Sequence, residues 1–98
     1  MKMKKHKIVI QYPAKKDVKE SVSWYNQQQK GLGKRFTADL RNTLLRIENN
    51  PASYAVRYAQ NRKANLSKFP YGVFFYIDNI KGIVYIIAVK HNARDFAK

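Results

Sequence analysis

The chain has 98 residues, of which 20 are Lys or Arg and 6 are Asp or Glu, so its formal net charge is +14. Self-repulsion on this scale costs a small domain stability, which indicates a strongly anionic partner such as nucleic acid, a ribosome or an acidic protein. The length fits one domain with one core, and the absence of cysteine excludes disulfides and thiolate metal sites.

The two ends of the domain and its location follow from the same composition. We expect residues 1–98 to form a single domain whose residues 1–6 are a flexible basic start. Too few apolar residues follow that start for a signal sequence, and no later run is long enough to span a bilayer. These features predict a cytoplasmic protein without a membrane partner.

The pattern of the first 29 residues predicts one strand and one helix. Apolar residues alternate over residues 8–12, which is typical of a strand, and Pro13 ends it. Asp17 and Glu20 have the spacing of a capping box, which predicts that a helix begins there and runs to about Gln29. Trp24 lies beside the apolar stripe of this helix, and we expect it to be a core residue.

A second helix is expected after the flexible segment 30–33, which contains two glycines. Its apolar residues recur at helical spacing from Phe36, another expected core residue, to Ile47. The helix should stop at Asn49, since an asparagine and Pro51 follow. The two helices therefore form a hairpin that needs a flat partner.

The C-terminal half supplies that partner. Apolar residues alternate over 73–77 and again over 83–89, and the loop 78–82 between them predicts an antiparallel pair. A weaker alternation over 62–68 predicts one more strand. The expected fold class is α+β in the order βααβββ, with the N-terminal helical hairpin packed on one face of a mainly antiparallel four-stranded sheet.

The other face of this sheet is the candidate binding surface. Arginine, lysine and tyrosine side chains suit phosphate contact together with base stacking. The alternative is that the tyrosines are packing residues and the lysines protect sheet edges. The candidate target-binding residues are Arg62, Lys68, Tyr71, Tyr76 and Lys90, with Tyr85 beside them.

The residue inventory narrows the chemistry. The six carboxylates are scattered, so no two-metal nuclease site is expected, and two histidines do not make a metal site. No phosphate-binding glycine motif occurs, and we expect no cofactor. Metal-independent RNA cleavage stays open, because the 2′-hydroxyl needs only a base, an acid and cations. His91 would be the base or acid, and the flanking Lys90 and Arg94 the cations, although a lone histidine at a strand end is commonly structural.

Three stretches, residues 24–36, 47–51 and 69–95, together resemble the RelE/ParE superfamily of bacterial toxins. The resemblance spans nearly the whole chain. It implies a toxin of a type II toxin–antitoxin pair, neutralised by an antitoxin that is expected to be acidic. RelE-like members are ribosome-dependent mRNA endonucleases, whereas ParE-like members poison DNA gyrase.

Carrying over the nuclease residues favours the ParE-like branch slightly. Lys63 matches a lysine of the nuclease branch, which implies that Lys63 would act with His91 and Arg94 in a nuclease. The position two residues on, where that branch has the companion of this lysine, is occupied by Asn65 instead. Gly72 and Asn92 stand where that branch has arginines, and no terminal tyrosine follows. His91 partly restores the resemblance to the nucleases, because several of them use a histidine near this end. Gyrase is therefore the expected target, with a ribosome-dependent endonuclease as the alternative and a non-toxic nucleic-acid-binding module as the third.

Overall fold

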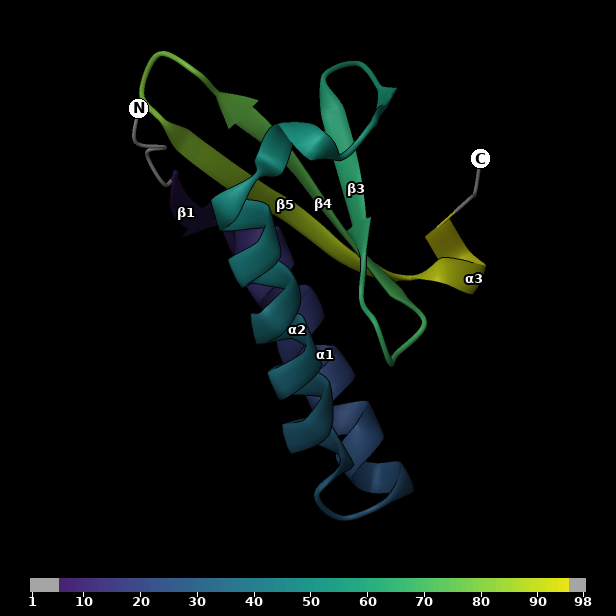
Figure 1. Ribbon diagram of the computed structural model, residues 1–98. Helices are drawn as coiled ribbons and strands as arrows, with labels where there is room; N and C mark the ends of the chain where they lie inside the picture. Colours follow the sequence, from purple (N-terminus) through teal and green to yellow (C-terminus); the bar gives the residue numbers. More distant parts are fainter. Residues whose placement is uncertain (1–5, 96–98) are drawn as a thin grey trace.

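Two long helices lie against one face of a five-stranded sheet (Figure 1). The computed structural model describes the chain from residue 6 to residue 95, and its side chains as far as Ala93. The elements are β1 (Lys7–Ile10), α1 (Tyr12–Gln28), α2 (Leu32–Asn49), a 3-10 turn (Pro51–Ser53), β2 (Val56–Tyr58), β3 (Asn61–Asn65), β4 (Tyr71–Asp78), β5 (Ile83–His91) and α3 (Asn92–Asp95).

The sheet order is β1-β5-β4-β3-β2, with β1 parallel to β5 and every other pair antiparallel. The predicted α+β class and the helical hairpin packed on a mainly antiparallel sheet are confirmed, and the predicted order βααβββ differs from the observed one by β2 and the short α3. The predicted strand number is wrong, because residues 6–95 form five strands and not four. The missed strand is β2, whose three residues are all exposed and therefore carry no inward-facing apolar pattern.

α1 begins five residues earlier than the predicted capping box. Tyr12 is its first residue, and Pro13 fits the first turn because the amides there have no partner within the helix. The predicted strand end at Tyr12 and the capping role of Asp17 are thus both wrong. The Asp17 carboxylate instead accepts the backbone N–H of Val89 at 2.9 Å and pairs with the Lys90 ammonium at 3.1 Å. It joins α1 to the end of β5.

The turn between α1 and α2 is closed by two local devices. Gly31 has φ +86°, a left-handed conformation that favours glycine. The Asn26 side-chain oxygen accepts the Gly33 N–H at 2.9 Å, and a Cβ on Gly33 would lie 2.8 Å from the Asn26 side chain. We call residues 26–35 the hairpin tip. Figure 1 shows it projecting well beyond the end of the sheet.

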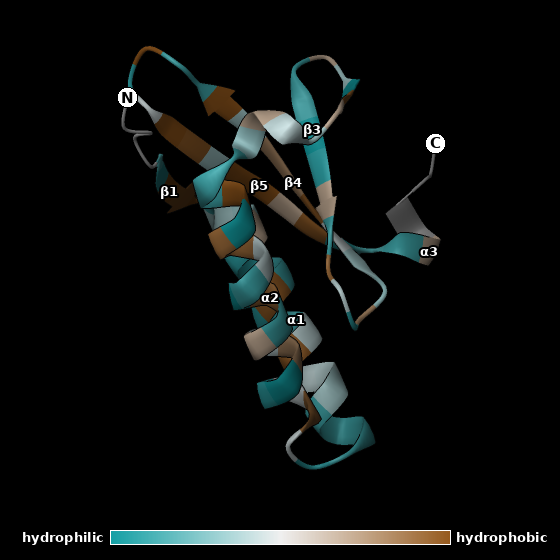
Figure 2. Ribbon diagram, in the orientation of Figure 1, coloured by the Kyte–Doolittle hydropathy of each residue, from teal (hydrophilic) through white to brown (hydrophobic). Residues whose placement is uncertain are grey.

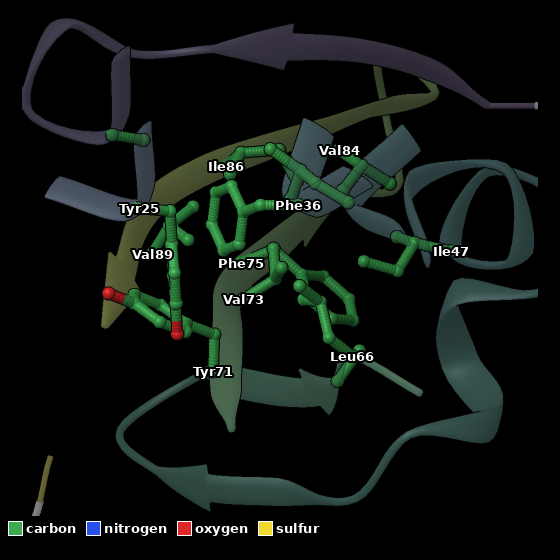
Figure 3. Packing of buried hydrophobic residues seen from close by; sticks show 13 residues of the cluster. Tyr25, Phe36, Ile47, Leu66, Tyr71, Val73, Phe75, Val84, Ile86 and Val89 are labelled. Atoms are coloured by element: carbon green, nitrogen blue, oxygen red, sulfur yellow. The ribbon is translucent and has the colours of Figure 1, made fainter. Parts of the chain in front are cut away.

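The core lies between the hairpin and the inner side of β4 and β5 (Figure 3). Phe36 is fully buried there, as expected, with Tyr25 and Tyr71 beside it. The expectation for Trp24 is wrong, because its side chain is 53 % exposed. Its neighbour Tyr25 takes the inward position, since consecutive helical residues point about 100° apart. In Figure 2 the apolar stretches of β4 and β5 contrast with the hydrophilic tip.

No helix within residues 6–95 combines the length and the apolar character that crossing a membrane requires.

Candidate functional site

One candidate surface is the open face of the sheet, the side away from the helices. Strand register places Lys63, Phe74 and Ala88 side by side on it. The Lys63 ammonium lies 5.5 Å from the centre of the Phe74 ring. Tyr76 and Tyr85 stack on the same face, with ring centres 5.1 Å apart. The structure therefore brings Lys63 and Tyr76 together with two further aromatic rings.

Gly72 lies between this cluster and Asn92, the first residue of α3. It pairs with Asn65 on one side and Lys90 on the other. A Cβ at Gly72 would collide with the Lys63 side chain and would lie 3.3 Å from the Asn92 side-chain oxygen. The lysine stem therefore occupies the space that a larger residue at position 72 would need.

Two predicted binding residues lie on the opposite, helix-facing side. Tyr71 is 4 % exposed, with its ring 4.9 Å from that of Phe36. Arg62 donates hydrogen bonds to the carbonyl oxygens of Tyr54, at 2.6 Å, and Ala52, at 3.4 Å. It joins β3 to the 3-10 turn. The structure does not bring these two residues to the open face.

Tyr71 also contacts Tyr25. Burial raises the pKa of the Tyr25 phenol, and the charge and hydrogen bond of Tyr71 raise it further. The Tyr25 hydroxyl therefore stays neutral under ordinary conditions and serves packing.

The second candidate surface is an open groove of about 590 Å³ between α1 and the end of β5. The His91 ring lies 5.2 Å from that of Tyr71, and the His91 Nδ1 accepts the backbone N–H of Ala93 at 3.1 Å. That bond leaves Nε2 to carry the proton of the neutral imidazole. Trp24 lines the groove with its exposed ring. The lining residues are Asp17, Glu20, Ser21, Trp24, Tyr71, Val89, Lys90, His91 and Ala93.

A β-bulge explains why His91 faces this groove. Phe74 of β4 pairs with Ala88, but the next residue, Phe75, pairs with Ile86. Ile87 is therefore an extra residue in β5. One inserted residue reverses the side to which every later residue points.

The remaining predicted residues lie near the same end of the sheet. Lys68 is exposed in the loop before β4, and its backbone N–H binds the Asp39 carboxylate at 2.7 Å. Arg94 belongs to α3, but its side chain is outside the described part of the chain. Among the described residues, no three His, Asp or Glu side chains gather as metal ligands.

The family described as "ParE toxin of type II toxin-antitoxin system, parDE" matches residues 8–96. The chain belongs to the ParE toxin family. It is therefore a toxin of a type II toxin–antitoxin system, which confirms the resemblance to the RelE/ParE superfamily. No curated protein sequence matches the chain.

Solved structures have the same fold. A chain of the chromosomal ParDE system from P. aeruginosa is similar with a TM-score of 0.75 and 12 % identity, over 88 % of this toxin and 95 % of that chain. A chain of the intact E. coli RelBE complex gives 0.66 and 17 %, over 86 % and 93 %. A chain of the M. tuberculosis RelBE2 complex gives 0.67 and 18 %, over 94 % and 97 %.

The toxin uses its few carboxylates on its own backbone. Asp17 binds the N–H of Val89, Asp39 binds those of residues 67–69, and Asp78 binds that of Lys81. Half of the six acidic residues thus hold the fold together by accepting backbone N–H groups. Sequence reasoning missed this use of the acids, because their partners lie up to 72 residues away in the chain.

Proposed function

We propose that this toxin arrests growth by binding DNA gyrase and not by cleaving mRNA. The observation that carries the proposal is the separation of the two described residues expected to catalyse cleavage. Lys63 points to the open face, whereas His91 faces the groove on the helix side. A base and a cation must both reach one phosphate group to within hydrogen-bond distance. Lys63, on the other side of the sheet from His91, does not meet that condition, and Lys90, which lies in the same groove as His91, is paired with Asp17 at 3.1 Å.

The substitutions around this site favour the same target. The nuclease branch has an arginine where this chain has Gly72. The Lys63 side chain occupies the space that a side chain at position 72 would need. ParE-like members of the superfamily are the ones expected to act on gyrase. A toxin that acts by contact needs a binding surface and no catalytic group.

We also infer that the toxin is cytoplasmic and that its cognate antitoxin is acidic. The similar structures come from toxin–antitoxin systems, ParDE and RelBE. A chain with a net charge of +14 attracts a partner of opposite sign and speeds its association.

The first test is expression in a bacterial host without antitoxin. We expect incorporation of labelled thymidine to fall within minutes, before incorporation of labelled amino acids, because gyrase inhibition blocks replication first. Linear DNA should accumulate in the same cells. An early loss of amino-acid incorporation with intact DNA would favour mRNA cleavage and contradict the proposal.

A double variant tests the nuclease alternative directly. We expect Lys63→Ala with His91→Ala to remain toxic within about threefold of wild type, because neither side chain takes part in chemistry at the target. Lys81→Ala, on the exposed β4–β5 loop, controls for the lost charge. Circular dichroism checks folding. A folded double variant that has lost toxicity but still binds gyrase as wild type does, while Lys81→Ala keeps its toxicity, would support RNA cleavage.

A further inference from the structure

We propose that the hairpin tip is a contact site for duplex DNA, so that the toxin touches the DNA held by its target as well as the target itself. The inference deepens the proposed gyrase function and rests on it for its biological role. Three cations, Lys30, Lys34 and Arg35, are exposed on the tip.

The tip carries a concentrated positive charge. No acidic residue occurs between Glu20 and Asp39, a stretch that contains all three of these cations. The rest of the exposed tip consists of glycine and side-chain amides, which donate and accept hydrogen bonds. A convex surface of this composition matches the phosphate and sugar groups along a duplex.

Stability of the fold does not account for two of these cations. Lys34 and Arg35 lie in the first two turns of α2, whose first turn contains no acidic residue. The start of a helix has a partial positive charge, so cations there are unfavourable. Their presence at this end indicates that they serve an external anion.

The tip has a defined turn and is joined directly to the core, although it lies far from the sheet. Gly31 and the bond between Asn26 and Gly33 close the turn, and Phe36 anchors α2 in the core one residue beyond the tip. Figure 1 shows the turn at the far end of the molecule, where a large partner has access. A backbone whose turn is already formed has less conformational entropy to lose when it binds.

The ligand class is duplex rather than single-stranded. Residues 26–35 contain no aromatic residue on which an unpaired base would stack. Phosphate contact without stacking favours the continuous charge of a duplex.

The test measures binding of a fluorescent 20-base-pair DNA duplex by anisotropy at several salt concentrations. The variant has Lys30→Gln, Lys34→Gln and Arg35→Gln together. We expect its affinity to fall at least about tenfold at low salt, and the slope of log K against log salt to become shallower by about 2.7, or 0.9 for each lost phosphate contact. The melting temperature should stay equal or rise, because two unfavourable cations at the start of α2 are removed.

The matched control removes the same charge elsewhere. Lys15→Gln, Lys16→Gln and Lys19→Gln neutralise three exposed lysines near the other end of α1. We expect the slope of this variant to change by less than about 1. Equal losses in the two triple variants would overturn the inference, because the attraction would then be diffuse. Tighter binding of the wild type to a single strand than to the duplex would also overturn it. So would a loss of polyglutamate binding in the tip variant that equals its loss of DNA binding, because the site would then attract any polyanion.

Inhibition of gyrase supercoiling, measured in parallel, separates this inference from the proposed function. A tip variant that keeps its DNA affinity but no longer inhibits gyrase would overturn the inference and leave the target in place. A tip variant that loses DNA affinity, with a wild type that does not inhibit gyrase, would support the DNA contact and remove the proposed target.

Discussion

Replacing Phe36 by alanine is expected to destabilise the domain by about 3–5 kcal/mol, which is a large part of the 5–15 kcal/mol typical of a small protein. The ring is fully buried and lies against three others: the distances between ring centres are 5.5 Å to Tyr25, 5.4 Å to Phe69 and 4.9 Å to Tyr71. Its removal leaves a cavity at the junction of both helices and the sheet. Urea unfolding followed by circular dichroism measures the loss.

Trp24→Ala is the informative comparison, because tryptophan is the larger side chain. Its ring is 53 % exposed and meets Tyr25 edge-on at 5.0 Å. We expect a loss of about 1 kcal/mol, since removing half-exposed surface leaves little cavity. Equal losses in Trp24→Ala and Phe36→Ala would mean that the burial pattern is wrong.

Local patterns in the sequence predicted the elements but not how they meet. The spacing of Phe36 and Ile47 predicted the inner face of α2 correctly, because helical periodicity reports burial directly. The prediction that Trp24 is a core residue was wrong, because an apolar stripe about 100° wide has two sides and tertiary packing decides which aromatic residue turns inward. The prediction that Asp17 caps the helix was wrong, because its partners are 72 and 73 residues away in the chain. No local signal carries such a contact.

The candidate site depends on a feature that alternation alone conceals. Strict alternation from Tyr85 would place His91 on the open face, beside Lys63. The extra residue at Ile87 reverses the side for the rest of β5, so His91 turns toward Tyr71 instead. A single bulge therefore separates the two groups that the resemblance would join for RNA cleavage.

Asp39→Ala is expected to cost about 3 kcal/mol. The carboxylate is 4 % exposed and accepts the backbone N–H groups of Ser67 at 3.3 Å, Lys68 at 2.7 Å and Phe69 at 3.0 Å. A hydrogen bond to a charged group contributes about 1.5–3 kcal/mol, and partly buried amides left without an acceptor add a further cost. Urea unfolding gives the free energy, and hydrogen exchange at residues 67–69 locates the change.

Two comparisons make the result specific to the three amides. Asp39→Asn keeps the shape and one oxygen, but its NH₂ group faces a donor, so we expect an intermediate loss of about 1–2 kcal/mol. Asp78→Ala removes a carboxylate that binds a single amide in an exposed loop, and should cost less than about 1 kcal/mol. An Asp39→Ala protein as stable as Asp78→Ala would contradict the account. Because a loss of about 3 kcal/mol leaves most domains of this size folded, we expect Asp39→Ala to remain folded at low temperature with a loosened loop 67–69, which carries the target-binding candidate Lys68.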